Sequence, residues 1–202
     1  MTDLVRGPDG RRRCGWGASA PEYVGYHDEE WGRPVTDDDG LYERLTLEAF
    51  QSGLSWLTIL RKREAFRKAF AGFRIGSVAR FAQADVERLL GDAAIVRNRA
   101  KIDAAIANAR AAAALDEPLS TLIWSFRPTG RRRAPRSLAE VPASTPESKA
   151  LASELKRRGF RFVGPTTAYA LMQACGLVND HLAGCWVRAE IEAERSATQR
   201  QH

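Results

Sequence analysis

The chain has 202 residues, of which 44% are hydrophobic, enough for one domain with a substantial core. It carries 31 Lys and Arg against 25 Asp and Glu, and this net charge of +6 favours polyanionic partners without requiring them. The odd number of cysteines, three, argues against a disulfide framework. The polar start MTDLVRGPDGRRR argues against a signal peptide, so we expect a soluble cytoplasmic protein.

The first forty residues show no sustained hydrophobic period. Residues 1–11 are polar and glycine-rich and are predicted to form a flexible basic arm. From Cys14 to Asp39, glycine, proline and aromatic residues alternate irregularly, which predicts loops and short turns.

Helical periodicity begins after this segment. Thr36 is a candidate N-cap, because the acids at 37–39 would lie in the first turn, where the helix dipole favours them. This helix is predicted to end near Gly53, and a second helix to run from Ser55 to Gly72. Further helices are predicted over 85–90 and 97–114.

Residues 127–146 break the periodicity with prolines and arginines, which predicts an exposed basic connector. A helix then begins with Thr145 as its N-cap and Pro146 in its first turn, and ends at Gly159. Another helix is predicted over 165–176. No segment has a convincing strand pattern, so the predicted fold class is all-α.

The two helices at 146–175 would form a hairpin with a glycine-bearing turn. The start of the second helix offers free backbone N–H groups and the positive end of its dipole, which suit a phosphate. Gly164 would allow DNA to approach closely, and Thr166 would add an N–H group and a hydroxyl. From the local pattern alone, an ordinary packed helical hairpin fits at least as well.

Four candidate metal ligands lie near the two ends of the chain. They are Cys14, His27, His181 and Cys185. Two cysteines and two histidines complete a tetrahedral zinc site without room for water, and such a site would be structural. The alternative is two buried thiols and two hydrogen-bonded histidines, and the spacing does not decide between them. Cys175 lies on an apolar helix face and fits core packing.

The N-terminal half also concentrates aromatic residues around one acid, Glu48. The aromatic residues are Trp16, Tyr23, Tyr26, Trp31 and Trp56. Such a box with a single carboxylate suits a flat, cationic ligand whose N–H groups donate hydrogen bonds. The alternative is that the tryptophans are core anchors and Glu48 is a paired surface acid.

Taken together, these residues resemble the 3-methyladenine DNA glycosylase I family, within the helix-hairpin-helix DNA glycosylase superfamily. The matching strings are RCGW (13–16), YHDEEWG (26–32), LTLEAFQSGLSW (45–56), LKRRGFRFVG (155–164) and MQACGLVNDH (172–181). The resemblance covers about residues 12–186, and the strings are long and rich in Trp, Cys and His.

The resemblance implies a helix-hairpin-helix glycosylase fold, with residues 12–188 as one domain of two helical lobes. Residues 189–202 are predicted to be a disordered tail. One structural zinc ion would join the N- and C-terminal segments through Cys14, His27, His181 and Cys185. Glu48 matches the catalytic acid that hydrogen-bonds the flipped base.

Further site residues follow from the same resemblance. Tyr26 and Trp56 match the aromatic residues that stack on the base, and Trp16 and Trp31 would line the pocket. Gly53 and Leu54 match the plug that fills the gap in the duplex, and Gly164 and Thr166 fall at the phosphate-binding hairpin.

Two departures from the wider superfamily bear on mechanism. Asn179 stands where many relatives have a catalytic Asp, and Thr166 stands where bifunctional members have a Lys, so no Schiff base is expected. The implied activity is monofunctional: hydrolysis of the N-glycosidic bond of 3-methyladenine in alkylated double-stranded DNA, by a monomer, leaving an abasic site. Phe50 replaces a more polar residue of the family and leaves the pocket shape open.

Two other classes of function remain to be weighed. A zinc-dependent nuclease or hydrolase would use the same cysteines and histidines, but four protein ligands leave no site for an activated water. A non-enzymatic DNA-binding module would account for the hairpin and the basic balance, but not for the aromatic residues around Glu48.

Overall fold

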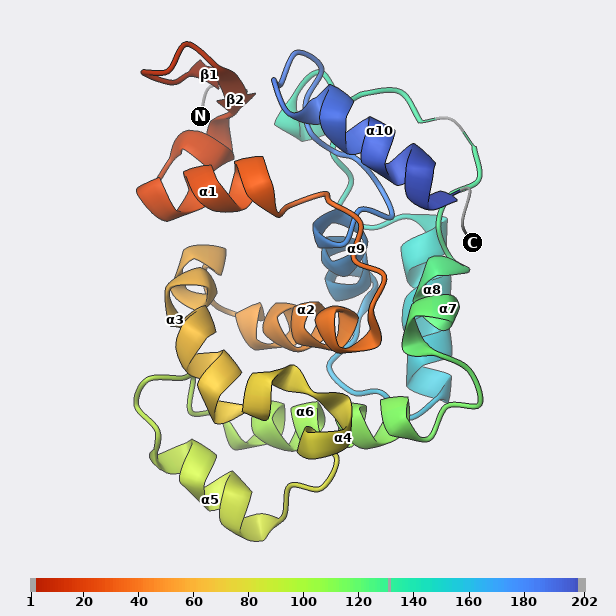
Figure 1. The fold of residues 1–202 in the computed structure, drawn as a ribbon. Helices are drawn as coiled ribbons and strands as arrows, with labels where there is room; N and C mark the ends of the chain where they lie inside the picture. The colour runs from red at the N-terminus through yellow and green to blue at the C-terminus, as the bar shows by residue number, and fades with distance from the viewer. Residues whose placement is uncertain (1–2, 131, 200–202) are drawn as a thin grey trace.

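The computed structural model describes residues 3–130 and 132–199, and over these ranges the protein is mostly helical (Figure 1). Its α-helices are α1 (Pro21–Glu29), α2 (Asp38–Gln51), α3 (Trp56–Ala69), α4 (Ile75–Val78), α5 (Gln83–Gly91), α6 (Arg99–Ala113), α7 (Leu119–Trp124), α8 (Pro146–Arg157), α9 (Pro165–Ala174) and α10 (Arg188–Gln199). Two strands, β1 (Leu4–Arg6) and β2 (Arg12–Cys14), precede them. Among the described helices, none is both long and apolar enough to cross a membrane.

The longer helices begin where their capping side chains are. Ser55 accepts a hydrogen bond from the Thr58 N–H at 3.2 Å and starts α3, and Thr145 caps α8 as predicted. The cap of α2 is Asp37 rather than the predicted Thr36, because the Asp37 carboxylate accepts from the Gly40 N–H at 2.7 Å. Local polar chemistry therefore sets these helix starts.

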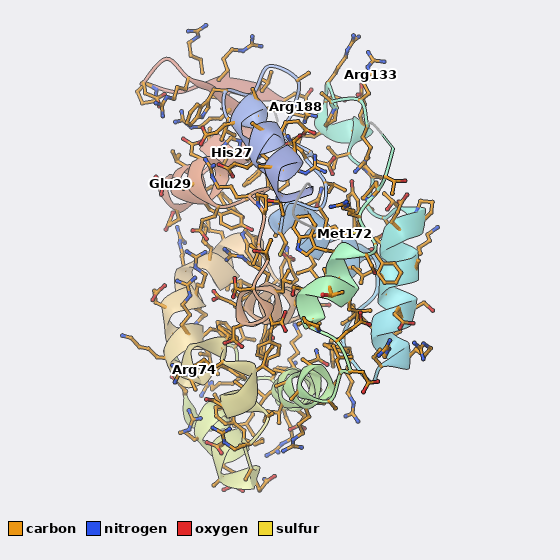
Figure 2. All side chains as sticks on the ribbon, turned by 45° about the vertical axis from the view of Figure 1, so that its right-hand side comes forward. His27, Glu29, Arg74, Arg133, Met172 and Arg188 are labelled. Carbon is orange, nitrogen blue, oxygen red and sulfur yellow. The ribbon has the colours of Figure 1, made fainter. Side chains whose placement is uncertain are left out.

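Helix α2 lies at the centre of the molecule, in contact with α3, α6, α7 and α9 (Figure 1). Its apolar residues Leu41, Leu45 and Phe50 are fully buried in the main core, which also contains Met172 of α9 (Figure 2). At its N-terminal end, Asp38 accepts hydrogen bonds from the first backbone N–H groups of α7. The central helix is thus fixed by neighbouring helices along its length.

The N-terminal segment is an antiparallel hairpin, which corrects the predicted flexible arm and the absence of strands. Leu4 pairs with Cys14, and the turn is closed by an ion pair between Arg13 Nη2 and Asp9 Oδ2 at 2.7 Å. Leu4 packs against a second, smaller apolar cluster near the C-terminal end of the chain. These contacts are distant in sequence, so local periodicity did not reveal them. Residues 1–2 lie outside the described residues.

Helix α1 occupies a stretch that was predicted to be loops and turns. Pro21 stands in its first turn, where the missing N–H is tolerated. Its buried residues, Tyr26, His27 and Asp28, are consecutive rather than spaced by helical turns. The helix therefore lacks the apolar stripe by which a sequence pattern is recognised.

The predicted disordered tail is also corrected, because residues 188–199 form α10. Ile191 is fully buried, and Arg195 donates hydrogen bonds to the carbonyl oxygens of Gly176 (2.6 Å) and Leu177 (2.8 Å). The hydrogen bonds from buried Arg195 to these carbonyl oxygens thus hold α10 against the preceding segment, although the sequence of α10 is strongly polar. Residues 200–202 lie outside the described residues.

The connector at 127–146 is largely irregular, with one short 3₁₀ turn at Leu138–Glu140. Arg132 and Arg133 are exposed, as expected, whereas Arg131 of the same run falls outside the described residues. Arg132 also donates a hydrogen bond to the Tyr169 hydroxyl at 3.0 Å, which ties the connector to α9.

The end of α9 depends on one glycine. Gly176 has φ +78°, and a Cβ built there would lie 2.7 Å from the carbonyl oxygen of Gly32. We expect Gly176→Ala to lower the free energy of unfolding by about 2 kcal/mol or more, because backbone strain and overlap add. Denaturant titration measures this.

Gly91→Ala is the matched control, since that glycine ends α5 with no atom within 4 Å of a built Cβ. This variant should match or exceed the wild-type stability. Equal losses in the two variants would contradict the role given to Gly176.

Candidate active site and metal centre

A cavity of about 280 Å³ lies between α1, α2, α3 and α9. Its walls are formed by Trp16, Tyr23, Tyr26, Trp31, Glu48, Gln51, Trp56, Ala170 and Gln173. The structure therefore brings together Glu48 and all five aromatic residues of the predicted box. The aromatic residues surround a cavity rather than filling a core.

The aromatic rings of this cavity support one another edge-on. Trp16 and Trp31 have ring centroids 4.9 Å apart at an interplanar angle of 80°, and Tyr23 meets Trp16 at 5.7 Å and 90°. On the other side, Tyr26 and Trp56 lie 5.4 Å apart, tilted by 43°. Such contacts restrict the rotation of each ring, so the walls present flat aromatic surfaces at fixed positions.

Glu48 is the acidic group of the cavity and is only 7% exposed. Burial raises the pKa of its carboxyl from 4.5 to about 8, against the opposing effect of Arg44 one turn earlier on α2. The pKa of the Tyr26 hydroxyl is likewise raised, chiefly by burial and then by Glu48. A carboxylate deprived of water in this way gains most from a cationic, hydrogen-bond-donating ligand.

Arg44 belongs to a partly buried ionic network near Glu48. Its Nη2 lies 3.1 Å from Oε2 of Glu30, and Arg63 Nη2 donates to Oε1 of the same carboxylate at 2.8 Å. Burial opposes the charge of Arg44, while neighbouring groups raise its pKa. The network leaves a positive charge close enough to Glu48 to act on it electrostatically without forming an ion pair with it.

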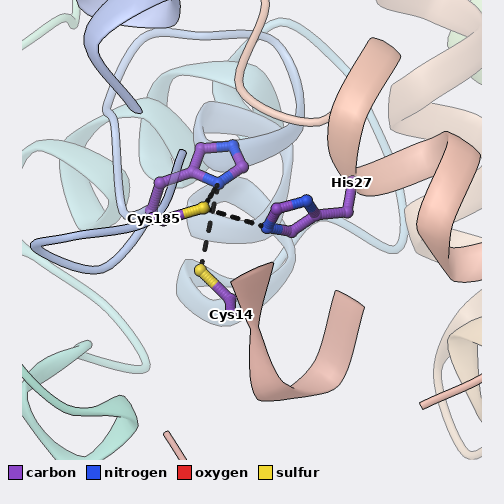
Figure 3. A group of neighbouring side chains, drawn as sticks. Cys14, His27 and Cys185 are labelled. Atoms are coloured by element: carbon purple, nitrogen blue, oxygen red, sulfur yellow. Dashed lines mark hydrogen bonds between the residues drawn. The ribbon is translucent and has the colours of Figure 1, made fainter. Parts of the chain in front are cut away.

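The four predicted metal ligands form one buried cluster. Their ligand atoms all lie within 4.8 Å of one another. Cys185 Sγ lies 3.4 Å from His27 Nε2 and 3.6 Å from His181 Nδ1 (Figure 3). His181 Nδ1 lies 3.9 Å from Cys14 Sγ. The donor set and its compactness make this cluster able to hold a metal ion.

Hydrogen bonds outside the cluster orient both histidines. His27 Nδ1 is 2.7 Å from Oδ1 of Asp28, and His181 Nε2 is 3.0 Å from the carbonyl oxygen of Trp31. Each of these acceptors takes the ring N–H and leaves the other nitrogen free for a metal. Asp28 is itself held by Arg13, whose Nη2 lies 2.6 Å from Oδ2.

The metal cluster and the cavity share a wall. The Trp31 ring lines the cavity and packs 4.6 Å from the His181 ring, while the Trp16 ring lies 5.2 Å from that of His27. Gly17 belongs to the same contact, since a Cβ there would come within 2.4 Å of the His27 ring. The cluster thus lies directly behind two of the aromatic walls.

The four residues predicted to contact DNA lie on two turns outside the cavity wall. Gly53, with φ +82°, and Leu54, which is 41% exposed, form the turn between α2 and α3. Gly164 is the N-cap of α9, and Thr166 is exposed in its first turn. Leu54 stands between Gln51 and Trp56 in the chain, and both of these line the cavity.

Three cavity residues were not predicted: Gln51, Ala170 and Gln173. Gln51 follows Glu48 by three positions on α2, a spacing that could have indicated a shared face. Phe50, which left the pocket shape open, packs 4.8 Å from Phe66 in the core and does not line the cavity.

Asn179 also lies away from the cavity. Its Nδ2 donates to Oε2 of Glu192 at 2.9 Å, and it therefore helps to hold α10. Asn179, for which the resemblance implied the place of a catalytic Asp, thus forms a hydrogen bond to α10 in this chain.

Comparisons with known proteins agree on one family. The sequence profile described as methyladenine glycosylase matches residues 16–189. DNA-3-methyladenine glycosylase 1 of Escherichia coli is 49% identical over 179 residues, which cover 86% of this chain and 95% of that protein.

Solved structures give the same result. A crystal structure of 3-methyladenine DNA glycosylase I has a TM-score of 0.83 at 48% identity, covering 86% of this chain and 98% of that chain. A variant of 3-methyladenine DNA glycosylase I in complex with 3-methyladenine has a TM-score of 0.82 at 32% identity, covering 87% and 97%.

The burial of Glu48 generates a pH-dependent prediction. The fold raises the pKa of this carboxyl from 4.5 to about 8, so the folded state binds the proton more tightly than the unfolded state. The stability that the protonated carboxyl contributes is therefore fully present below pH 4.5 and is lost as the pH rises through 8. We expect the free energy of unfolding of the wild type to fall relative to that of Glu48→Gln by up to about 3 kcal/mol between pH 5 and pH 8. Paired denaturant titrations over this range measure the difference, and a flat or rising difference would contradict the burial of the carboxyl.

Proposed function

The chain belongs to the methyladenine glycosylase family, and on this premise we propose that it is a monofunctional glycosylase that releases 3-methyladenine from alkylated double-stranded DNA. One observation carries the proposal: a desolvated carboxyl group, Glu48, which a bound cation would ionise, faces a cavity whose walls are aromatic. This combination suits a flat cation that donates hydrogen bonds, and 3-methyladenine attached to the sugar is such a group.

The cavity favours the methylated base over adenine through charge. Methylation at N3 places a positive charge on the purine, which Glu48 and the faces of Tyr26 and Trp56 attract. Unmodified adenine is neutral, so it gains less from the same walls while paying the same cost of leaving the base stack. Selection therefore rests on the free energy of the flipped state.

Catalysis in this site needs little help at the sugar. The glycosidic bond of the cationic nucleotide is already weakened, and the base departs as a neutral molecule. Stacking between aromatic walls, with Glu48 accepting from the base, holds the nucleotide unstacked near its transition-state geometry. Water then attacks C1′ of an oxocarbenium-like state. No lysine is among the residues described as lining the cavity, which supports hydrolysis without a Schiff base.

The DNA duplex would be held at the two turns outside the cavity. Helices α8 and α9 provide the helix-hairpin-helix unit, in which Gly164 and Thr166 offer backbone N–H groups to a phosphate. Leu54, following Gly53, would fill the gap left by the extruded nucleotide. Its exposure and its place between two cavity residues in the chain support this role.

We assign one zinc ion to the Cys14, His27, His181 and Cys185 cluster, with a structural role. Zinc bonds of about 2.3 Å to sulfur and about 2.0 Å to nitrogen separate tetrahedral ligands by about 3.6 Å, close to the distances in this cluster. Four protein ligands leave no position for water, and none of the four lines the cavity. Both features argue against a zinc-dependent hydrolase. Three free buried cysteines support the cytoplasmic location expected from the sequence.

Removal of the Glu48 charge tests the proposed activity. We expect Glu48→Gln to release 3-methyladenine from alkylated duplex DNA about 100-fold more slowly, because the amide does not complement the cation. Chromatography of the released base measures the rate.

Glu43→Gln is the control, since Glu43 lies on the same helix but pairs with Arg67 outside the cavity, and it should retain the wild-type rate. Retention of DNA without release of any base by the wild type would instead support a non-enzymatic binding module.

The zinc assignment has its own test. We expect one zinc per chain by atomic emission, lost in Cys185→Ala together with several kcal/mol of stability, because metal binding contributes directly to folding. Cys175→Ala, which removes the buried cysteine outside the cluster, should keep the metal. Loss of base excision on chelation, at a temperature where the metal-free fold persists, would indicate catalytic rather than structural zinc.

A further inference from the structure

Lys101, on α6, is a buried lysine that holds the end of α2. It is 8% exposed, and its Nζ donates hydrogen bonds to the carbonyl oxygens of Phe50 at 2.8 Å and Ser52 at 2.5 Å. These carbonyls lie at the C-terminal end of α2, where they have no partner within the helix and where a cation is favoured by the dipole. The next residues are Gly53 and Leu54, so Lys101 fixes the base of that turn.

Asn108, on the same helix, holds the other turn. It is 1% exposed; its Nδ2 donates to the carbonyl oxygen of Arg161 at 3.0 Å, and its Oδ1 accepts from the Arg161 N–H at 2.7 Å. The following residue, Phe162, has φ +55° and is 44% exposed. A non-glycine residue persists in this conformation only where its surroundings impose it, and the double hydrogen bond at Arg161 does so.

The two side chains are related by the geometry of α6. They are seven residues apart, which is about two helical turns and about 10 Å along the axis, so they lie on one face. Figure 1 shows α6 below α2, and its Asn108 reaches the loop that joins α8 to α9. Both turns are therefore attached to one rigid element, by side chains that do not line the cavity.

We propose that Lys101 and Asn108 are positioning residues that set the separation of the two turns that contact duplex DNA. The inference rests on the proposed function, in which the 53–54 turn enters the duplex while the start of α9 holds a phosphate. DNA has a fixed phosphate spacing, so both contacts form together only if the two turns are correctly separated. A misplacement of about 1 Å at such contacts reduces the rate strongly. Binding of the free base uses the cavity alone and does not depend on this separation.

Arg110 provides a matched control on the same helix. Its Nε donates to the carbonyl oxygen of Ala79 at 3.0 Å, and its Nη2 to that of Phe81 at 2.7 Å. It thus attaches a loop to α6 through the same kind of contact, but that loop has no assigned role in DNA binding. Because Arg110 is exposed whereas Lys101 and Asn108 are buried, the affinity for the free base is also needed to separate positioning from a general loss of structure.

The experiment compares Lys101→Met, Asn108→Ala and Arg110→Met in the full chain. Three quantities are measured for each variant. They are kcat/KM for release of 3-methyladenine from duplex DNA, the affinity for a duplex that carries an abasic-site analogue, and the affinity for free 3-methyladenine. We expect the first two variants to lose at least 10-fold in kcat/KM and in duplex affinity, with free-base affinity within 2-fold of wild type. Arg110→Met should resemble the wild type in all three.

Hydrogen exchange locates the effect. Amides at 52–55 should exchange faster only in Lys101→Met, and amides at 161–164 only in Asn108→Ala. Where Lys101→Met folds poorly, Lys101→Arg, which keeps a cation beside the two carbonyl oxygens, should give an intermediate loss. The inference would be overturned if Lys101→Met and Asn108→Ala kept kcat/KM and duplex affinity within 2-fold of wild type. It would also be overturned if they lost as much affinity for the free base as for the duplex. Absence of base release by the wild type would refute the proposed function instead, and the duplex affinities would still decide the inference.

Discussion

The structure depends on a carboxylate held out of water. Glu48 sits on the central helix, where its neighbours are aromatic rings, and its desolvation is the free-energy cost that a bound cation offsets. The surrounding elements maintain that condition: α1 and α3 bring Tyr26 and Trp56, and α9 closes the remaining wall. Arg44 acts on Glu48 from behind without forming an ion pair with it, so the acid keeps its capacity for a ligand.

The metal cluster and the base cavity are parts of one structure. Trp31 contributes its ring to the cavity and its carbonyl oxygen to His181, so the orientation of that ring depends on the cluster. Trp16 follows Cys14 by two residues and packs on the His27 ring. The cluster therefore packs behind two of the aromatic walls of the cavity and restricts their orientation.

Local polar signals were readable from the sequence, and tertiary ones were not. Ser55 and Thr145 mark helix starts because a cap acts on the next few residues only. Helix α10 and the N-terminal hairpin escaped prediction because distant contacts hold them: Arg195 reaches backbone carbonyls before α10, and the Trp186 N–H donates to the carbonyl oxygen of Arg12. The aromatic residues were predicted as a group because they lie close together in the sequence around Glu48. Gln173 was missed because it reaches the cavity wall only through the packing of α9 against α2.

The long separation of the cluster's members along the chain has a consequence for biosynthesis. Cys14 and His181 are 167 residues apart, so their contact closes a long loop and forms only after the segment that follows α9 is available. Until His181 and Cys185 have been synthesised, the chain lacks the support behind Trp16 and Trp31. The two aromatic walls thus gain their support only when segments far apart in the chain meet.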